Sequence, residues 1–174
     1  FFLAQFLFTL GNSSNQFLLL RSMDLGYMLS TVILMYAIFN FTTSALSSAF
    51  GSLSDRIGRK KLLMAGYALY AVVYIAFGFI SPSTGFLLWV FWPLYGLYYA
   101  MTEGVEKAFV ADIAPENSRA TALGFYHTII GIGLLPASVI AGFLFTVHPG
   151  SPFVFGGSLA VLTVLILGFG VREK

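Results

Sequence analysis

Two glutamates, a lysine and a histidine have the types and spacing that could move a proton. Glu106 and Lys107 lie three and four residues after Glu103, so on a helix the three residues would share one face. Glu103 and Lys107 stand in the favourable order for an internal ion pair, which would leave Glu106 unpaired. His127 can change charge near neutral pH and, counted from the intervening connection, lies at the depth of Glu103. We predict a proton-coupling or gating cluster; the alternative is a structural ion network at the end of the helix.

Neutral polar side chains form a second set, suited to binding a solute. Amides recur at helical spacing near the start of the chain, another lies within a later apolar run, and three tyrosines precede Glu103 on its own stripe. Amides can bond a solute without the cost of a charge, but they also join helices, and both interpretations stay open. The candidates for lining a cavity are Asn12, Gln16, Asn40, Tyr95, Tyr98 and Tyr99.

The composition shows which solvent must surround these residues. Of 174 residues, 58% are hydrophobic and 9% are charged, against roughly 25% charged in a typical soluble domain. Lipid must therefore be the main solvent. The chain has no cysteine, and its acidic and histidine residues lack a metal-ligand spacing such as HExxH. We expect no metal, no cofactor and no nucleic-acid partner.

Uncharged stretches divide the chain into six predicted membrane spans, since about 20 apolar residues in helix cross a bilayer core. Two long stretches, 62–102 and 120–171, each hold two spans, separated by turns rich in Pro and Gly at 81–85 and 148–152. We therefore predict an all-α membrane protein, a single six-helix bundle over 1–174. Its expected spans are approximately 1–20, 28–50, 62–80, 86–111, 119–147 and 153–171.

The basic residues predict which side of the bundle faces the cytoplasm. With the six spans laid antiparallel, Arg21 alone falls on one side, and Lys107 lies near the other. That other side carries Arg56, Arg59, Lys60, Lys61, Arg119, Arg172 and Lys174. Because basic residues are retained on the cytoplasmic side, the loop 51–61 and the C-terminus should face the cytoplasm. We expect a multi-pass protein of the plasma (inner) membrane.

The segment Gly51–Lys61, which reads GSLSDRIGRKK, carries a recognisable motif. It resembles the loop signature of the major facilitator superfamily, GxxxDRxGR followed by Arg or Lys. The matching residues are Gly51, Asp55, Arg56, Gly58, Arg59 and Lys60. A glycine lets helix ends approach or the chain turn, the aspartate can face a positive helix end, and the basic residues suit the anionic inner leaflet. In the family this loop bridges helix ends and steadies one alternating-access state, so we expect a gating role.

The resemblance implies the architecture of one half of a transporter. Six-helix halves of this family contain 3+3 inverted repeats, here expected over 1–80 and 86–171. The fourth span lacks the Arg usual in an N-terminal half, which favours the C-terminal half. Phe1 stands inside an apolar run without an initiator Met, so we expect a fragment whose partner bundle precedes it. Pro136, in the fifth span, is a candidate hinge.

The expected function is that of a secondary active transporter, not an enzyme. The resemblance implies that a small-molecule substrate passes by alternating access between this bundle and an N-terminal six-helix half, with protons as the candidate coupling ion. The chain has no P-loop that would bind ATP. Two alternatives stay open: a complete six-helix protein that works as a homodimer, and an integral-membrane enzyme using Glu103, Glu106 and His127.

Overall fold

A computed structural model describes residues 1–170, and within them the chain is α-helical apart from short connections. The all-α prediction is confirmed for this part of the chain. The end of the last predicted span at 171 and the basic residues Arg172 and Lys174 lie outside the described residues. The helices are α1 (Phe2–Gly11), α2 (Gln16–Asp24), α3 (Leu29–Ile57), α4 (Arg59–Phe79), α5 (Leu88–Ile113), α6 (Arg119–Val147) and α7 (Ser151–Gly170), with the 3-10 helices η1 (Pro82–Leu87) and η2 (Glu116–Ser118).

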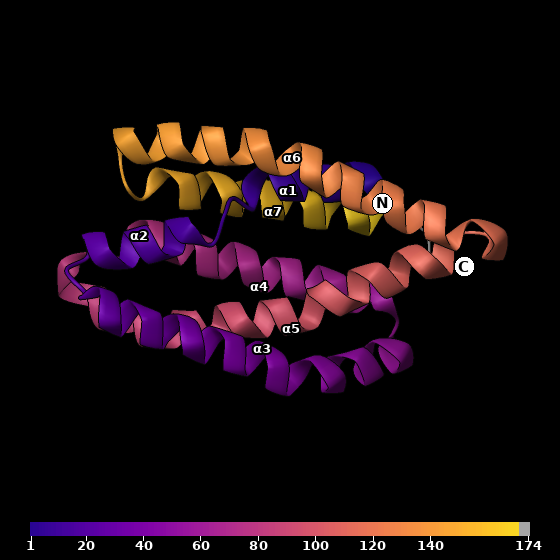
Figure 1. Ribbon diagram of the computed structural model, residues 1–174, viewed down its shortest axis with the longest axis horizontal. Helices are drawn as coiled ribbons and strands as arrows, with labels where there is room; N and C mark the ends of the chain where they lie inside the picture. The colour runs from indigo at the N-terminus through magenta and orange to yellow at the C-terminus, as the bar shows by residue number, and fades with distance from the viewer. Residues whose placement is uncertain (171–174) are drawn as a thin grey trace.

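The helices form two layers that meet along one side (Figure 1). α1, α6 and α7 make one layer, and α3, α4 and α5 make the other, with α2 beside them. α4 packs against α7 and so joins the layers. The buried face of α4 supplies the aromatic centre of the core, including Tyr67, Tyr70, Tyr74 and Phe77. α5 and α6 also contact each other, and a cavity opens between α1, α5 and α6.

The first predicted span, 1–20, is divided in the structure. α1 ends at Gly11 and α2 starts at Gln16, so residues 12–15 interrupt the helix. This linker reads Asn-Ser-Ser-Asn, four residues whose side chains compete with the helical hydrogen bonds of the backbone. The carbonyl of Gly11, freed by the break, accepts a hydrogen bond from the Tyr70 hydroxyl at 3.0 Å. The break lets α1 lie with α6 and α7 while α2 lies with the other layer.

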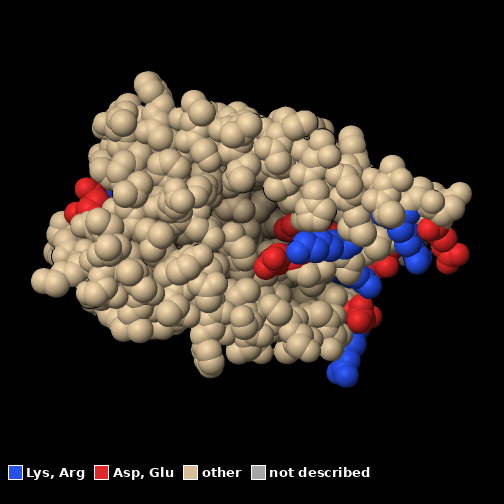
Figure 2. All heavy atoms as spheres, in the orientation of Figure 1, with Lys and Arg blue, Asp and Glu red and all other residues tan. Residues whose placement is uncertain are grey.

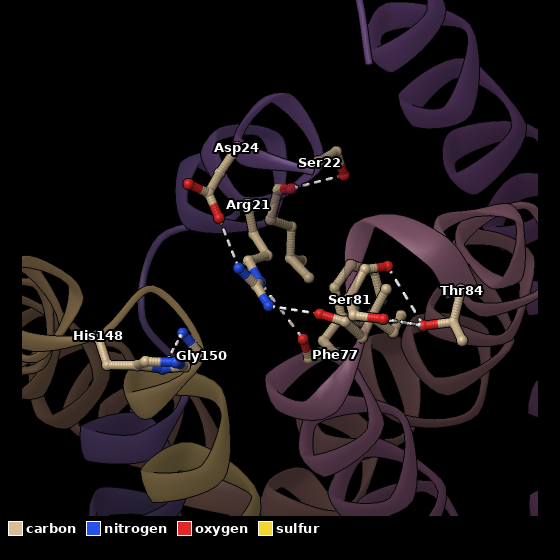
Figure 3. Close-up of polar contacts among 10 residues, drawn as sticks. Arg21, Ser22, Asp24, Phe77, Ser81, Thr84, His148 and Gly150 are labelled. Atoms are coloured by element: carbon tan, nitrogen blue, oxygen red, sulfur yellow. Dashed lines mark hydrogen bonds and ion pairs between the residues drawn. The ribbon is translucent and has the colours of Figure 1, made fainter. Parts of the chain in front are cut away.

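A buried arginine fastens α2 to the end of α4 (Figure 3). Arg21 is 6% exposed, and its guanidinium donates to the carbonyl of Ile80 at 2.6 Å and to that of Phe77 at 3.5 Å. It also pairs with Asp24 at 2.5 Å. These carbonyls belong to the C-terminal end of α4, where the helix dipole favours a cation. Arg21 therefore replaces the hydrogen bonds that the end of α4 cannot make for itself.

The predicted cytoplasmic loop 51–61 is shorter than expected. α3 continues to Ile57 and α4 begins at Arg59, so most of the signature is helical and Gly58 alone forms the turn. Gly58 has a φ of 96°, which a residue with a Cβ adopts only with strain. A Cβ at Gly51 would meet nothing within 4 Å, so the expected close approach of helix ends at this residue is absent from the described chain.

Four described helical segments are long and apolar enough to cross a membrane: α3, α4, α6 with its preceding turn, and α7. The first span is divided into two short helices, and α5 carries charged and tyrosine residues among its apolar ones. Counting α1 with α2 as one span and adding α5 gives the six-helix bundle that the sequence predicts.

Candidate functional site

The open side of the molecule contains a polar cavity of about 390 Å³ between α1, α5 and α6. Figure 2 shows this face hollowed, with acidic and basic side chains gathered at one end of the hollow. The cavity brings together seven of the residues that the sequence singled out: Asn12, Tyr98, Tyr99, Glu103, Glu106, Lys107 and His127. The stripe predicted on the fourth span therefore faces a shared space.

Glu106 is the buried carboxylate of the cavity wall, only 7% exposed. It accepts hydrogen bonds from Gln5 Nε2 at 3.2 Å, from the Tyr67 hydroxyl at 2.8 Å and from the Tyr126 hydroxyl. The Tyr67 hydroxyl also lies 2.7 Å from Gln5 Oε1. Among the described residues no lysine, arginine or histidine forms an ion pair with Glu106. Neutral groups from three other helices, α1, α4 and α6, thus hold this carboxylate.

The sequence does not link these three residues to Glu106, although Gln5 belongs to the polar stripe of the first predicted span. Gln5 is an amide in an apolar stretch, at helical spacing from Asn12, and this spacing was the available signal. Tyr126 directly precedes His127, and the sequence favours the histidine because it can change charge near neutral pH. Tyr67 lies in a helix with several similar tyrosines, and nothing in the sequence distinguishes it. Only the packing of four helices brings the set together.

Glu103 and Lys107 form the predicted pair within α5. Their Oε1 and Nζ atoms are 3.4 Å apart, and the two side chains are 56% and 45% exposed. His127 lines the same cavity, but no hydrogen bond or ion pair joins it to either glutamate in the described part of the chain. The four candidate residues thus divide into a buried carboxylate, an exposed pair and a nearby imidazole.

The amides of the helix break contact the tyrosines of α5. Asn12 Nδ2 donates to the Tyr98 hydroxyl at 3.3 Å. Asn15 Oδ1 accepts from the hydroxyls of Tyr95 and Tyr99 at 2.7 Å and 3.3 Å. Tyr95 is fully buried and does not line the cavity, so it positions Asn15 instead. The break in the first span therefore places amide groups beside the phenol rings of α5.

Two predicted cavity residues lie elsewhere. Gln16 is exposed at the start of α2 and is not part of the cavity lining. Asn40 is exposed on α3, where its side chain donates to the carbonyl of Tyr36 at 2.8 Å. A helical amide that bonds to its own preceding turn needs no partner across the bundle. Their place in a wider cavity stays a prediction.

The family signature is held by ion pairs at the end of the bundle that the sequence assigns to the cytoplasm. Arg59 Nε lies 2.6 Å from Asp112 Oδ2, and its Nη2 lies 3.3 Å from Asp55 Oδ1. Lys60 Nζ donates to the carbonyl of Gly168 at 3.3 Å. The signature thus connects the ends of α3, α4, α5 and α7.

Among the described residues, Arg56 of the signature and the candidate hinge Pro136 make no side-chain polar contact that points to a role. Arg56 is exposed in the last turn of α3. α6 runs without a break through Pro136, which is exposed. The hinge role of this proline stays a prediction.

The fold and the cavity together define a class: a polytopic membrane protein whose helices enclose polar groups on one open side. The sequence profile of the Major Facilitator Superfamily matches residues 1–174, and the chain belongs to this family of transporters.

Three curated proteins show what the chain is similar to in sequence. The chain is 40% identical to an uncharacterized MFS-type transporter of Methanocaldococcus jannaschii, over 97% of the chain and 44% of that protein. It is 32% identical to multidrug resistance protein 1 of Bacillus subtilis, over 80% of the chain and 35% of the relative. It is 28% identical to the quinolone resistance protein NorA of Staphylococcus aureus, over 82% of the chain and 36% of that protein. The chain thus spans less than half the length of these curated relatives.

Proposed function

We propose that this chain is the C-terminal six-helix half of a secondary active transporter that moves a small organic solute by alternating access. The observation that carries the proposal is the open cavity whose wall contains the buried carboxylate of Glu106. A charged group retained within a membrane bundle is costly and marks a functional site by default. The open side of the cavity is where a partner bundle would complete the solute site. An N-terminal half of the same transporter is the proposed partner, and a second copy of this chain is the alternative.

The lining of the cavity suits a solute with an aromatic surface and polar groups. Phe8, Tyr98, Tyr99 and Tyr126 supply rings, and Asn12 supplies an amide. The Asn12 Oδ1 atom is buried and has no hydrogen-bond partner in the described part of the chain. A solute donor would satisfy it. Two of the relatives are named for multidrug and quinolone resistance, which supports an organic solute of this kind.

Glu106 is the proposed coupling group. As an anion it accepts three hydrogen bonds, from α1, α4 and α6. Once protonated, the carboxyl carries a hydrogen of its own and cannot accept all three bonds in the same way. Protonation would thus weaken the attachment of one helix to α5. The proton would then bind the two arrangements of the helices with different affinities. Coupling of proton binding to a conformational change requires such a difference.

The signature residues are proposed to stabilise one of those arrangements from the cytoplasmic side. Arg59 joins the ends of α3 and α5, and separating these ends would break its ion pairs with Asp55 and Asp112. The basic residues beside it favour the anionic inner leaflet of the plasma membrane.

Transport driven by an imposed pH gradient tests the proposal. The protein in its natural full length is reconstituted into liposomes, and movement of ethidium, a fluorescent aromatic solute, is followed. We expect the gradient to accelerate wild-type transport and Glu106→Gln to lose at least tenfold of that acceleration. Glu116→Gln is the matched control, because Glu116 is 91% exposed outside the cavity. Glu103→Gln and His127→Ala show whether the other candidates contribute. An unchanged gradient response in Glu106→Gln contradicts its coupling role.

A further inference from the structure

Lys107 is the only lysine or arginine among the described residues that line the cavity. The lining also contains two carboxylates, Glu103 and Glu106. Glu106 is already held by three neutral donors, whereas the partner of Glu103 is Lys107. The Lys107 ammonium is therefore a cation that already occupies the cavity, on a flexible side chain of the helix that forms the wall.

The pair between Glu103 and Lys107 has the properties of an exchangeable contact. The two atoms are 3.4 Å apart, both side chains are about half exposed, and the residues are one turn apart on the same helix. Exposed pairs at this spacing are weak because water screens them and because two long side chains must be ordered. A cation that binds from the cavity can thus replace the lysine at Glu103 with little loss.

An aromatic surface lies on the other side of Glu103. Tyr99 is one turn before Glu103, and Lys107 is one turn after it, so the three residues form one line along α5. Ring faces attract cations, most strongly where the cation is partly removed from water. An organic cation placed against Tyr99 would meet the carboxylate of Glu103 from the side opposite Lys107.

We infer that Lys107 is a specificity-determining residue that competes with organic cations for Glu103. This inference rests on the proposed function, because it assumes that the cavity binds solute. A monovalent cation with an aromatic body displaces the Lys107 ammonium, which moves into water at the mouth of the cavity. Lys107 thereby lowers the affinity for cations and leaves the affinity for neutral solutes unchanged.

Binding of two matched probes to the purified full-length protein tests this role. Tetraphenylphosphonium is a permanent monovalent cation, and triphenylphosphine oxide is a neutral compound with similar rings. We expect Lys107→Gln to bind the cation roughly threefold more tightly, because the cation no longer has to displace the ammonium from its weak pair with Glu103. Binding of the neutral probe should change less than about twofold. Equilibrium dialysis measures both.

Control variants separate competition from a general change in charge. Lys61→Gln removes the same charge from an exposed residue in the first turn of α4, outside the cavity, and should leave both affinities unchanged. Lys107→Arg keeps the charge and should behave like the wild type. In a Glu103→Gln background the gain from Lys107→Gln should shrink, because the contested carboxylate is gone. A gain of the same size in that background shows simple repulsion and overturns the competition.

Two further results overturn the inference. One is cation binding that is no tighter in Lys107→Gln than in the wild type. The other is the absence of tetraphenylphosphonium binding from both proteins. Neither result decides the proposed function, which stands or falls with transport driven by a pH gradient. An unaltered thermal unfolding midpoint in each variant shows that the substitutions leave the fold intact.

Discussion

Two carboxylates one turn apart on α5 differ in burial and in hydrogen-bond partners. Glu106 is buried and accepts hydrogen bonds from three other helices. Glu103 is more than half exposed and contacts a lysine of its own helix. The first joins four helices, and the second joins none. Residues of the same type on the same stripe can therefore have different surroundings, one bonded within the bundle and one exposed in the cavity.

The sharpest way to test this comparison is to remove the buried carboxylate. Glu106→Leu leaves the Gln5 amide and the Tyr126 hydroxyl without their acceptor, whereas the Tyr67 hydroxyl can still donate to Gln5 Oε1, and each unsatisfied group costs about 1–3 kcal/mol. We expect the free energy of unfolding in detergent to fall by at least about 2 kcal/mol. Glu116→Leu, at an exposed site, should change it by less than about 0.5 kcal/mol. A loss below about 1 kcal/mol in Glu106→Leu would mean that the network holds the bundle weakly.

The contrast between buried and exposed charges can also be tested with two arginines, the buried Arg21 and the half-exposed Arg119. Arg21→Met removes the donors that satisfy the carbonyls of Phe77 and Ile80, and bonds to charged groups contribute about 1.5–3 kcal/mol. We expect a loss of about 2 kcal/mol in denaturant unfolding. The control is Arg119→Met, since Arg119 is half exposed and lies 3.9 Å from Glu116. Equal losses in the two variants would remove the distinction between buried and exposed cations.

One hydroxyl of the buried network can be deleted without changing the shape of the core. Tyr126→Phe removes a single hydrogen bond to Glu106 and leaves the other two. The expected loss is about 1.5 kcal/mol, smaller than that for Glu106→Leu. Thermal unfolding of the two single variants and of the double variant measures their coupling. Strictly additive losses would argue against a shared network.

The smallest effect is expected at the exposed carboxylate. Glu103→Gln breaks a pair that water already screens, so stability should change by less than about 0.5 kcal/mol. Thermal unfolding beside Glu106→Gln makes the comparison direct. A loss above about 1 kcal/mol would show that Glu103 is structural and not a solute contact.

The sequence predicted the parts of the molecule that depend on local pattern. α6 is a helix over Arg119–Val147, where an uncharged run with flanking turns predicts both ends of a helix. The Glu103–Lys107 pair depends on helical spacing alone and was also found. The signature was expected to be a loop, but most of it is helical. α3 continues through it to Ile57, well beyond the length that a bilayer requires.

What could not be predicted depends on distant segments. Gln5 and Glu106 are 101 positions apart in the chain and meet only after four helices have packed. The break at 12–15 could not be predicted, because an apolar stretch with several polar residues is equally consistent with one continuous helix that has a polar face. Arg21 was expected on the outer side but not as the group that terminates α4.

The division of the first span has a consequence for the order of assembly. α1 has 10 residues and α2 has 9, and isolated helices shorter than about 12–15 residues are only marginally stable. At about 1.5 Å per residue, neither crosses a hydrocarbon core of about 30 Å. α1 must gain its stability from α6 and α7, and α2 from α3 and from the hydrogen bonds of Arg21 to the end of α4. The first segment of this bundle to be synthesised should therefore be among the last to become rigid, after the helices that follow it have already met.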